Sequence, residues 1–209
     1  MISKDRLLAI TDGIVAIAAT IMVLQLVIPE KASMAGFAEQ WPTLLAYIIS
    51  FMQIFLAWHE HHDSLAPAEW INHRIFLINC VWLFFITLLP FVTGVAGQSP
   101  DHSLSMLIYI GVLFLVQLTI SIESYAVVKL NGCTITDAPV IRVIRIISFA
   151  GYAIAAVCAL ILPESAFAII LALTIAEIVV MCRYDSKVTA RIRKMRSEQE
   201  NGSGKPEQE

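Results

Sequence analysis

Hydrophobic residues fall along the chain in six long runs that are separated by short polar segments. The runs cover residues 8–28, 42–58, 75–96, 104–128, 143–162 and 165–182. Each is close to the roughly 20 residues that a helix needs to cross the hydrocarbon core of a bilayer. The last two are divided only by Leu162-Pro163-Glu164, where a proline stops one helix and can begin the next. The pattern predicts an all-α polytopic membrane protein with six transmembrane helices.

Composition supports the same class of protein. Hydrophobic residues make up 58% of the chain and charged residues 15%, with a mean hydropathy of +0.75. The first run is too long for a removable signal peptide and lacks a small-residue cleavage site, so we expect it to remain in the protein. We therefore predict one membrane domain over residues 1–184. A basic and then disordered cytoplasmic tail is expected over residues 185–209, of which 185–200 can extend the sixth helix.

Basic residues indicate the orientation. With the N-terminus inside, the outer loops contain Lys31 alone, and every other Lys and Arg falls in an inner segment. This asymmetry predicts that both termini are cytoplasmic. The basic inner face follows from that topology and gives no reason to expect a nucleic-acid partner. The four cysteines lie in spans or in an inner loop, so we expect no extracellular disulfide.

Polar residues inside the first three spans gather near the inner ends. The first helix begins with RLLAITDG, the second ends with WHEHHD and the third begins with NHRIFLINCVW. Since these ends are neighbours, Arg6, Asp12, His61, His62 and Asn79 are expected to meet at one depth, where hydrogen bonds fix the packing of the helices. Arg6 can alternatively reach the interface as a snorkelling side chain, and Asp12 can simply complement the helix dipole.

The first helix also has one branched, apolar face. At about 100° per residue, Ile17, Thr20, Ile21, Leu24 and Ile28 lie within an arc of roughly 100°, and Gly13 lies on the same side. Such a stripe is typical of helix packing or of a lipid-facing surface. By itself it leaves a pore wall as one reading among three.

These residues resemble a known family, the endo-lysosomal potassium channel family, transmembrane protein 175, in its single-repeat prokaryotic branch. The family carries an Arg-x-x-x-Phe-Ser-Asp motif, commonly followed by Gly, which here reads Arg6, Ile10, Thr11, Asp12 and Gly13. Further matches are Trp58-x-x-His61-His62 at the end of the second helix, and Asn79 followed by LLPFVT in the third. The chain departs from the motif at two positions, since Ile10 replaces Phe and Thr11 replaces Ser.

The resemblance implies a homotetramer in the plasma membrane of a prokaryote, with the four first helices around an ion pathway. It assigns the constriction to Ile17, Ile21 and Leu24, with Thr20 beside them. It assigns a supporting network to one set of residues: Arg6, Thr11, Asp12, Gly13, Trp58, His61, His62 and Asn79. The implied function is a potassium-permeable channel for monovalent cations, with no cofactor, no metal and no enzymatic activity.

The mechanism expected of such a pore follows from hydration. A collar of Ile and Leu side chains disfavours continuous water and can close by dewetting. The chain contains no Thr-Val-Gly-Tyr-Gly filter, so selectivity of that type is excluded. Because potassium gives up its water more readily than sodium, we expect a leak-like channel with modest preference for potassium.

Two other classes of function stay open at this point. The segment from His59 to His62 has residue types that suit zinc or iron in an intramembrane metalloenzyme. Glu123 and Glu177, within the fourth and sixth spans, suit a secondary transporter that binds protons or a cation. Gln117 and Ser121 are the expected neighbours of Glu123.

Overall fold

A computed structural model describes residues 3–26, 33–66, 68, 70–132 and 138–203. In this part of the chain the elements are all helical: α1 (Lys4–Ile21), the 3₁₀ turn η1 (Met22–Gln25), α2 (Met34–Glu39), α3 (Trp41–Leu65), α4 (His73–Gln98), α5 (Ser103–Asn131), α6 (Ala138–Ile161) and α7 (Ser165–Ser203). Six of them are long and apolar enough to cross a membrane, which confirms the predicted number of spans. Lys31, Ile28 and Cys133 lie outside the described residues.

Local signals explain where the helices begin and end. The Ser3 hydroxyl accepts a hydrogen bond from the Arg6 N–H at the start of α1, and the Asn72 amide oxygen does the same for Ile75 at the start of α4. α5 ends at Gly132, which has a φ of 61°, a left-handed conformation that glycine adopts without strain. α6 ends at Ile161 and α7 begins at Ser165, so the predicted turn between the last two spans is confirmed.

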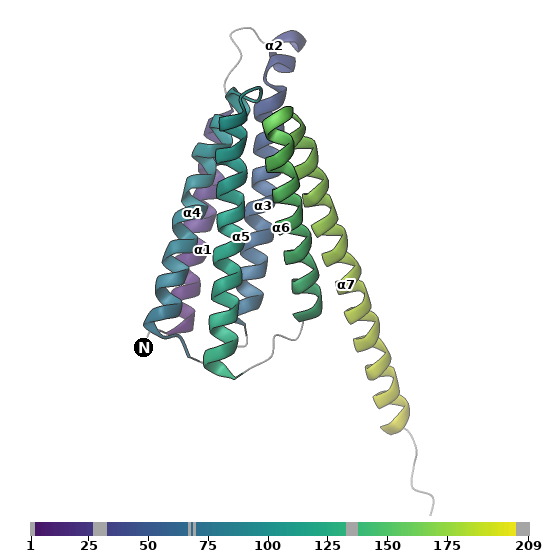
Figure 1. Ribbon diagram of the computed structural model, residues 1–209. Coiled ribbons are helices and arrows are strands. Elements are labelled where there is room, and N and C mark those ends of the chain that lie inside the picture. The colour runs from purple at the N-terminus through teal and green to yellow at the C-terminus, as the bar shows by residue number, and fades with distance from the viewer. Residues whose placement is uncertain (1–2, 27–32, 67, 69, 133–137, 204–209) are drawn as a thin grey trace, which may run out of the picture.

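The long helices form a bundle with their axes roughly along one direction (Figure 1). α1 begins and α7 ends at the same end of the bundle, and α7 continues to Ser203, well past the other helices. α1 packs against α3 and α4, whereas α7 packs against α3 and α6. Residues 185–203 therefore continue the sixth transmembrane helix, and residues 204–209 lie outside the described residues.

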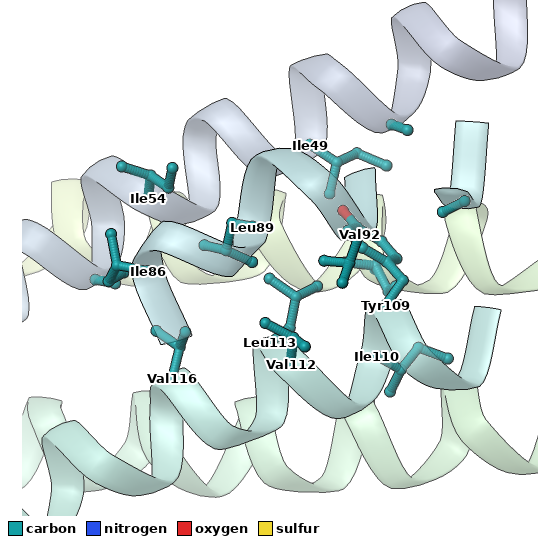
Figure 2. Packing of buried hydrophobic residues seen from close by; sticks show 14 of the residues in the cluster. Ile49, Ile54, Ile86, Leu89, Val92, Tyr109, Ile110, Val112, Leu113 and Val116 are labelled. Atoms are coloured by element: carbon teal, nitrogen blue, oxygen red, sulfur yellow. The ribbon is translucent and has the colours of Figure 1, made fainter. Parts of the chain in front are cut away.

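The main hydrophobic core lies between α3, α4 and α5. Figure 2 shows Ile49 of α3, Leu89 and Val92 of α4, and Leu113 of α5 converging there. A polar cluster lies within it, in which Thr93 donates to Ser50 over 2.7 Å and the Ser50 and Tyr109 hydroxyls lie 2.8 Å apart. Because lipid gives little hydrophobic drive for helix association, such interhelical bonds help to set the packing.

Close approach of α3 to α4 depends on Gly97. A Cβ added at Gly97 would lie 2.7 Å from the Thr43 Cα, and the Thr43 hydroxyl donates to the Gly97 carbonyl over 3.1 Å. We expect Gly97→Ala to lower the free energy of unfolding by about 1–3 kcal/mol, because backbone must shift to admit the methyl group. Thermal or denaturant unfolding of the protein in detergent measures the effect.

Gly111 of α5 provides the control for this prediction. Nothing lies within 4 Å of a Cβ added there, so Gly111→Ala should stabilise the helix by up to about 1 kcal/mol. Equal effects of the two substitutions would contradict the close approach at Gly97.

Candidate functional site

The residues predicted to form a pore wall lie on the exposed side of α1 and η1. Ile17 is 59% exposed, Ile21 45% and Leu24 75%, and Thr20 is also exposed. The opposite side of the same helix is buried against α3 and α4, through Leu7, Thr11, Val15, Ala18, Ala19 and Met22. α1 therefore presents an apolar face that no described residue of its own chain covers.

The exposed apolar face of α1 has open space beside it, and part of this face lines a cavity. Nothing lies within 4 Å of a Cβ added at Gly13. Beside it, between α1 and α4, is a cavity of about 430 Å³ whose walls include Ile17 and Ile21 of α1 and Phe91 of α4. Both features leave room for an apolar side chain from another helix.

Thr20 contributes the hydroxyl of this face. Its Oγ1 donates to the carbonyl of Ile17 over 2.9 Å, within the same helix. Because the proton is used in that bond, the oxygen presents lone pairs on the exposed side. A hydroxyl in this state is an acceptor and can serve as a ligand for a cation.

Asp12 is tied to α3 on the exposed side of the helices. The Trp58 indole Nε1 donates to Asp12 Oδ1 over 2.8 Å. The Trp58 ring in turn lies 5.8 Å from the His62 ring, centroid to centroid. One turn before the exposed stripe, α1 is thus fixed to α3 by a charge-assisted hydrogen bond.

A second, buried set joins four helices. Thr11 of α1 donates to Asn79 Oδ1 of α4 over 3.4 Å, and Asn79 Nδ2 lies 2.7 Å from His61 Nε2 of α3. The His61 ring stacks on Trp82 with centroids 4.4 Å apart and an interplanar angle of 10°. Glu123 of α5 completes the set, with Oε2 at 3.4 Å from His61 Nε2. His61 is 1% exposed and Glu123 0%.

The polar residues of the first three helices therefore divide into two groups, where the sequence predicted one cluster. Asp12, Trp58 and His62 meet on the exposed side, whereas His61 and Asn79 lie in the interior. The cause is helical geometry, since neighbouring residues such as His61 and His62 point about 100° apart. Arg6 joins neither group, because its guanidinium is exposed and has no partner among the described residues.

The expected neighbours of Glu123 are wrong. Gln117 donates to Glu60 over 2.9 Å, and the Ser121 hydroxyl donates to the carbonyl of Gln117. Glu123 lies beside His61 instead, and its carboxyl oxygens have no hydrogen-bond partner in the described structure. Spacing along α5 suggested the first pairing, but the rotation of α5 against α3 decides it.

Sequence reasoning missed two further polar contacts between spans. Arg145 of α6 pairs with Glu60 of α3, with Nε at 2.7 Å from Oε1. Glu177 of α7 receives bonds from the Ser148 hydroxyl and, over 3.1 Å, from Gln53 Nε2. For Glu60 and Arg145 the available signal was one charge of each sign at similar depth in two spans, because an intramembrane charge requires a partner.

The proposed metal ligands do not assemble into a site in the described residues. His59 pairs with Asp63 over 3.6 Å on the surface of α3, and no group of three or more His, Cys, Asp or Glu side chains is placed to hold an ion. Glu60 faces Arg145, a cation that disfavours a metal there.

The first part of the chain is similar in sequence to known proteins. Residues 6–90 match the family model described as "Endosomal/lysosomal potassium channel TMEM175". A protein from a Chryseobacterium species, named a potassium channel, is 39% identical over 97 residues, which is 46% of this chain and 50% of that protein. A second potassium channel, from Chamaesiphon minutus, is 28% identical over 116 residues, covering 51% of this chain and 57% of that protein.

The match to animal relatives is more limited. The zebrafish (Danio rerio) protein named "Endosomal/lysosomal proton channel TMEM175" is 30% identical over 114 residues, 49% of this chain and 22% of that protein. The aligned regions thus span about half the length of the bacterial relatives and a smaller share of the zebrafish protein. All are described as channels, and none as an enzyme.

A solved structure agrees over nearly the whole fold. The crystal structure of a lysosomal potassium-selective channel TMEM175 homolog from Chamaesiphon minutus has a TM-score of 0.72, with 21% identity, and the match covers 84% of this chain and 96% of that one. At this identity the likeness shows the fold. Residues 6–90 are thus similar to the endosomal/lysosomal potassium channel TMEM175 family, and the fold of the chain is that of a TMEM175 homolog.

Proposed function

We propose that this chain is the subunit of a potassium-permeable cation channel in the plasma membrane of a prokaryote. Four copies form the channel, with α1 of each facing a central pathway. The observation that carries the proposal is the uncovered apolar face of α1, where Ile17, Ile21 and Leu24 are exposed while the opposite side is packed. The match of residues 6–90 to a potassium channel family model supports a channel.

The proposed constriction works through hydration. Rings of Ile17, Ile21 and Leu24 make a neck from which continuous water is expelled, so an ion must shed part of its shell to pass. The acceptor oxygen of Thr20 replaces part of that shell. The free energy of losing this water is smaller for potassium than for sodium. The resulting preference for potassium is modest, because no ring of backbone carbonyls is involved.

The polar contacts of Asp12 and Thr11 hold α1 in position against α3 and α4. Asp12 bonds to Trp58 of α3, and Thr11 bonds to Asn79 of α4. α1 is therefore held to two helices about 8–9 Å along its axis from Ile17. Arg6 completes the motif at the membrane surface as a snorkelling cation. These residues support the position of the pore helix and do not face the ion.

The orientation and domain limits belong to the same proposal. Residues 1–184 form the channel domain, and residues 185–209 form a cytoplasmic tail. Both termini are cytoplasmic, which is supported by the basic residues gathered at the end of the bundle where α1 begins and α7 ends.

Ion flux tests the function directly. We expect purified protein in liposomes to carry electrogenic flux driven by a potassium gradient, with a smaller flux for an equal sodium gradient. Empty liposomes and liposomes with heat-denatured protein are the controls. Absence of flux for both cations would contradict the channel proposal.

Buried charges keep a secondary transporter as the second candidate. Glu177 of α7 is 4% exposed and is hydrogen-bonded to Gln53 of α3. Glu60 of α3 forms an ion pair with Arg145 of α6. Such groups can bind a proton or a cation in transport. Saturable counter-transport, in place of electrogenic flux down a single gradient, would favour this candidate.

A further inference from the structure

A groove runs between α4 and α5 on the outside of the bundle. It consists of two adjoining cavities of about 300 and 440 Å³, which share Arg74, Ile78 and Ile122. Above Arg74 the walls are apolar, with Leu77 62% and Val81 47% exposed. From Arg74 to Val81 the groove follows α4 for about 10 Å.

The groove has cations at one end only. Arg74 lies in the first turn of α4 and Lys129 in the last turn of α5, and both line the smaller cavity. Neither side chain has an ion-pair or hydrogen-bond partner in the part of the chain that the structure describes. The described walls of both cavities contain no Asp or Glu. Two positive charges without a counter-charge among the described residues therefore lie at the membrane surface, at one end of the apolar groove.

The groove faces away from the pore helix. At about 100° per residue, Arg74, Ile78 and Val81 fall within about 60° of one another on α4. Thr87 and Pro90, which line the cavity beside α1, fall on the opposite half of the same helix. The groove and the cavity beside α1 therefore lie on different sides of α4.

We propose that this groove binds an anionic phospholipid from the leaflet on the side where the chain begins. The headgroup phosphate lies between Arg74 and Lys129, where a guanidinium can donate two parallel hydrogen bonds to it. One acyl chain lies along Leu77, Ile78 and Val81. Tyr125, 68% exposed and also lining the smaller cavity, lies at the depth where aromatic side chains meet headgroups.

Charge decides which lipid class fits. The described residues of the site offer two cations and no anion. A lipid with net negative charge gains from both cations, whereas a zwitterionic headgroup brings an ammonium that they repel. An anionic surface is worth roughly 1 kcal/mol for each basic residue near it, so removing two corresponds to about thirtyfold weaker binding.

Native mass spectrometry of the full-length protein in detergent tests the proposal. The probes are phosphatidylglycerol and phosphatidylcholine with identical acyl chains. We expect the wild type to retain phosphatidylglycerol preferentially, and Arg74→Gln/Lys129→Gln to bind it about thirtyfold more weakly. Arg142→Gln is the matched control, because Arg142 is an exposed cation at the start of the α6 span and does not line the groove. This control should retain the lipid as the wild type does.

A second pair of variants tests the apolar half of the site. Ile122, 46% exposed, lines both cavities, so Ile122→Trp should fill the groove and weaken retention of the lipid. Ile154→Trp, at a 57% exposed position on α6, should not. Equal retention of the two lipids by the wild type, an equal loss in Arg142→Gln, or no effect of Ile122→Trp would overturn the proposal. Binding of soluble glycerol phosphate as tight as that of phosphatidylglycerol would also overturn it, since the acyl chain would then contribute nothing.

Discussion

Ile17→Asn is expected to raise cation flux through reconstituted protein about tenfold and to bring the ratio of potassium to sodium flux close to one. A tenfold change corresponds to lowering the barrier by roughly 1.4 kcal/mol. Four amides in place of four Ile side chains would keep the neck hydrated, so that an ion no longer has to shed its water there. Flux assays in liposomes with matched potassium and sodium gradients measure both quantities.

Ile154→Asn is the matched control for this substitution. Ile154 is 57% exposed on α6, almost the same as the 59% of Ile17, so both variants place an amide on an exposed helical surface. Only the variant on α1 should alter flux. If Ile17→Asn conducts and selects as the wild type does, Ile17 does not form the constriction.

His61→Leu is expected to lower the free energy of unfolding by about 1–3 kcal/mol, because it removes a buried polar ring nitrogen that lies 3.4 Å from Glu123 Oε2 and leaves buried polar groups unpaired. It also removes the ring nitrogen at 2.7 Å from Asn79 Nδ2 and the stacking on Trp82. Unfolding of purified protein in mild detergent, followed by circular dichroism, measures the loss.

The adjacent histidine gives the control. His62 is exposed, so His62→Leu should change stability by no more than about 0.5 kcal/mol. The double variant His61→Leu/Glu123→Leu should lose less than the sum of its single variants, because residues in contact are not additive. Equal losses for His61→Leu and His62→Leu would show that the buried pair does not stabilise the fold.

The six spans could be predicted from sequence because lipid restricts them so strongly. A spanning helix must be apolar over about 20 residues, so its position can be read from hydropathy alone. The turn at Leu162-Pro163-Glu164 was also predictable, since proline is disfavoured inside a helix and favoured in its first turn, and a glutamate follows it between two apolar runs. The contact of α1 with α3 through Asp12 and Trp58 involves two of the motif residues, although their pairing was not foreseen.

Partners across helices were harder to predict, and Glu123 shows why. Which side chains meet depends on the rotation of each helix about its axis and on its shift along that axis. Apolar surface does not determine either one, because lipid tails are as apolar as the helices. The same holds for the pair of Glu60 with Arg145, which joins residues 85 positions apart. The change from α-helix to 3₁₀ geometry at Met22 likewise left no clear signal in the hydrophobic pattern.

The proposed channel requires that Ile17, Ile21 and Leu24 of several protomers surround one ion pathway. Electron cryo-microscopy of the full-length protein in lipid nanodiscs tests this arrangement most directly. We expect four copies around one axis, with these three side chains pointing toward it and Thr20 beside them. A monomer or a dimer, or an assembly in which these side chains contact acyl chains, would contradict it.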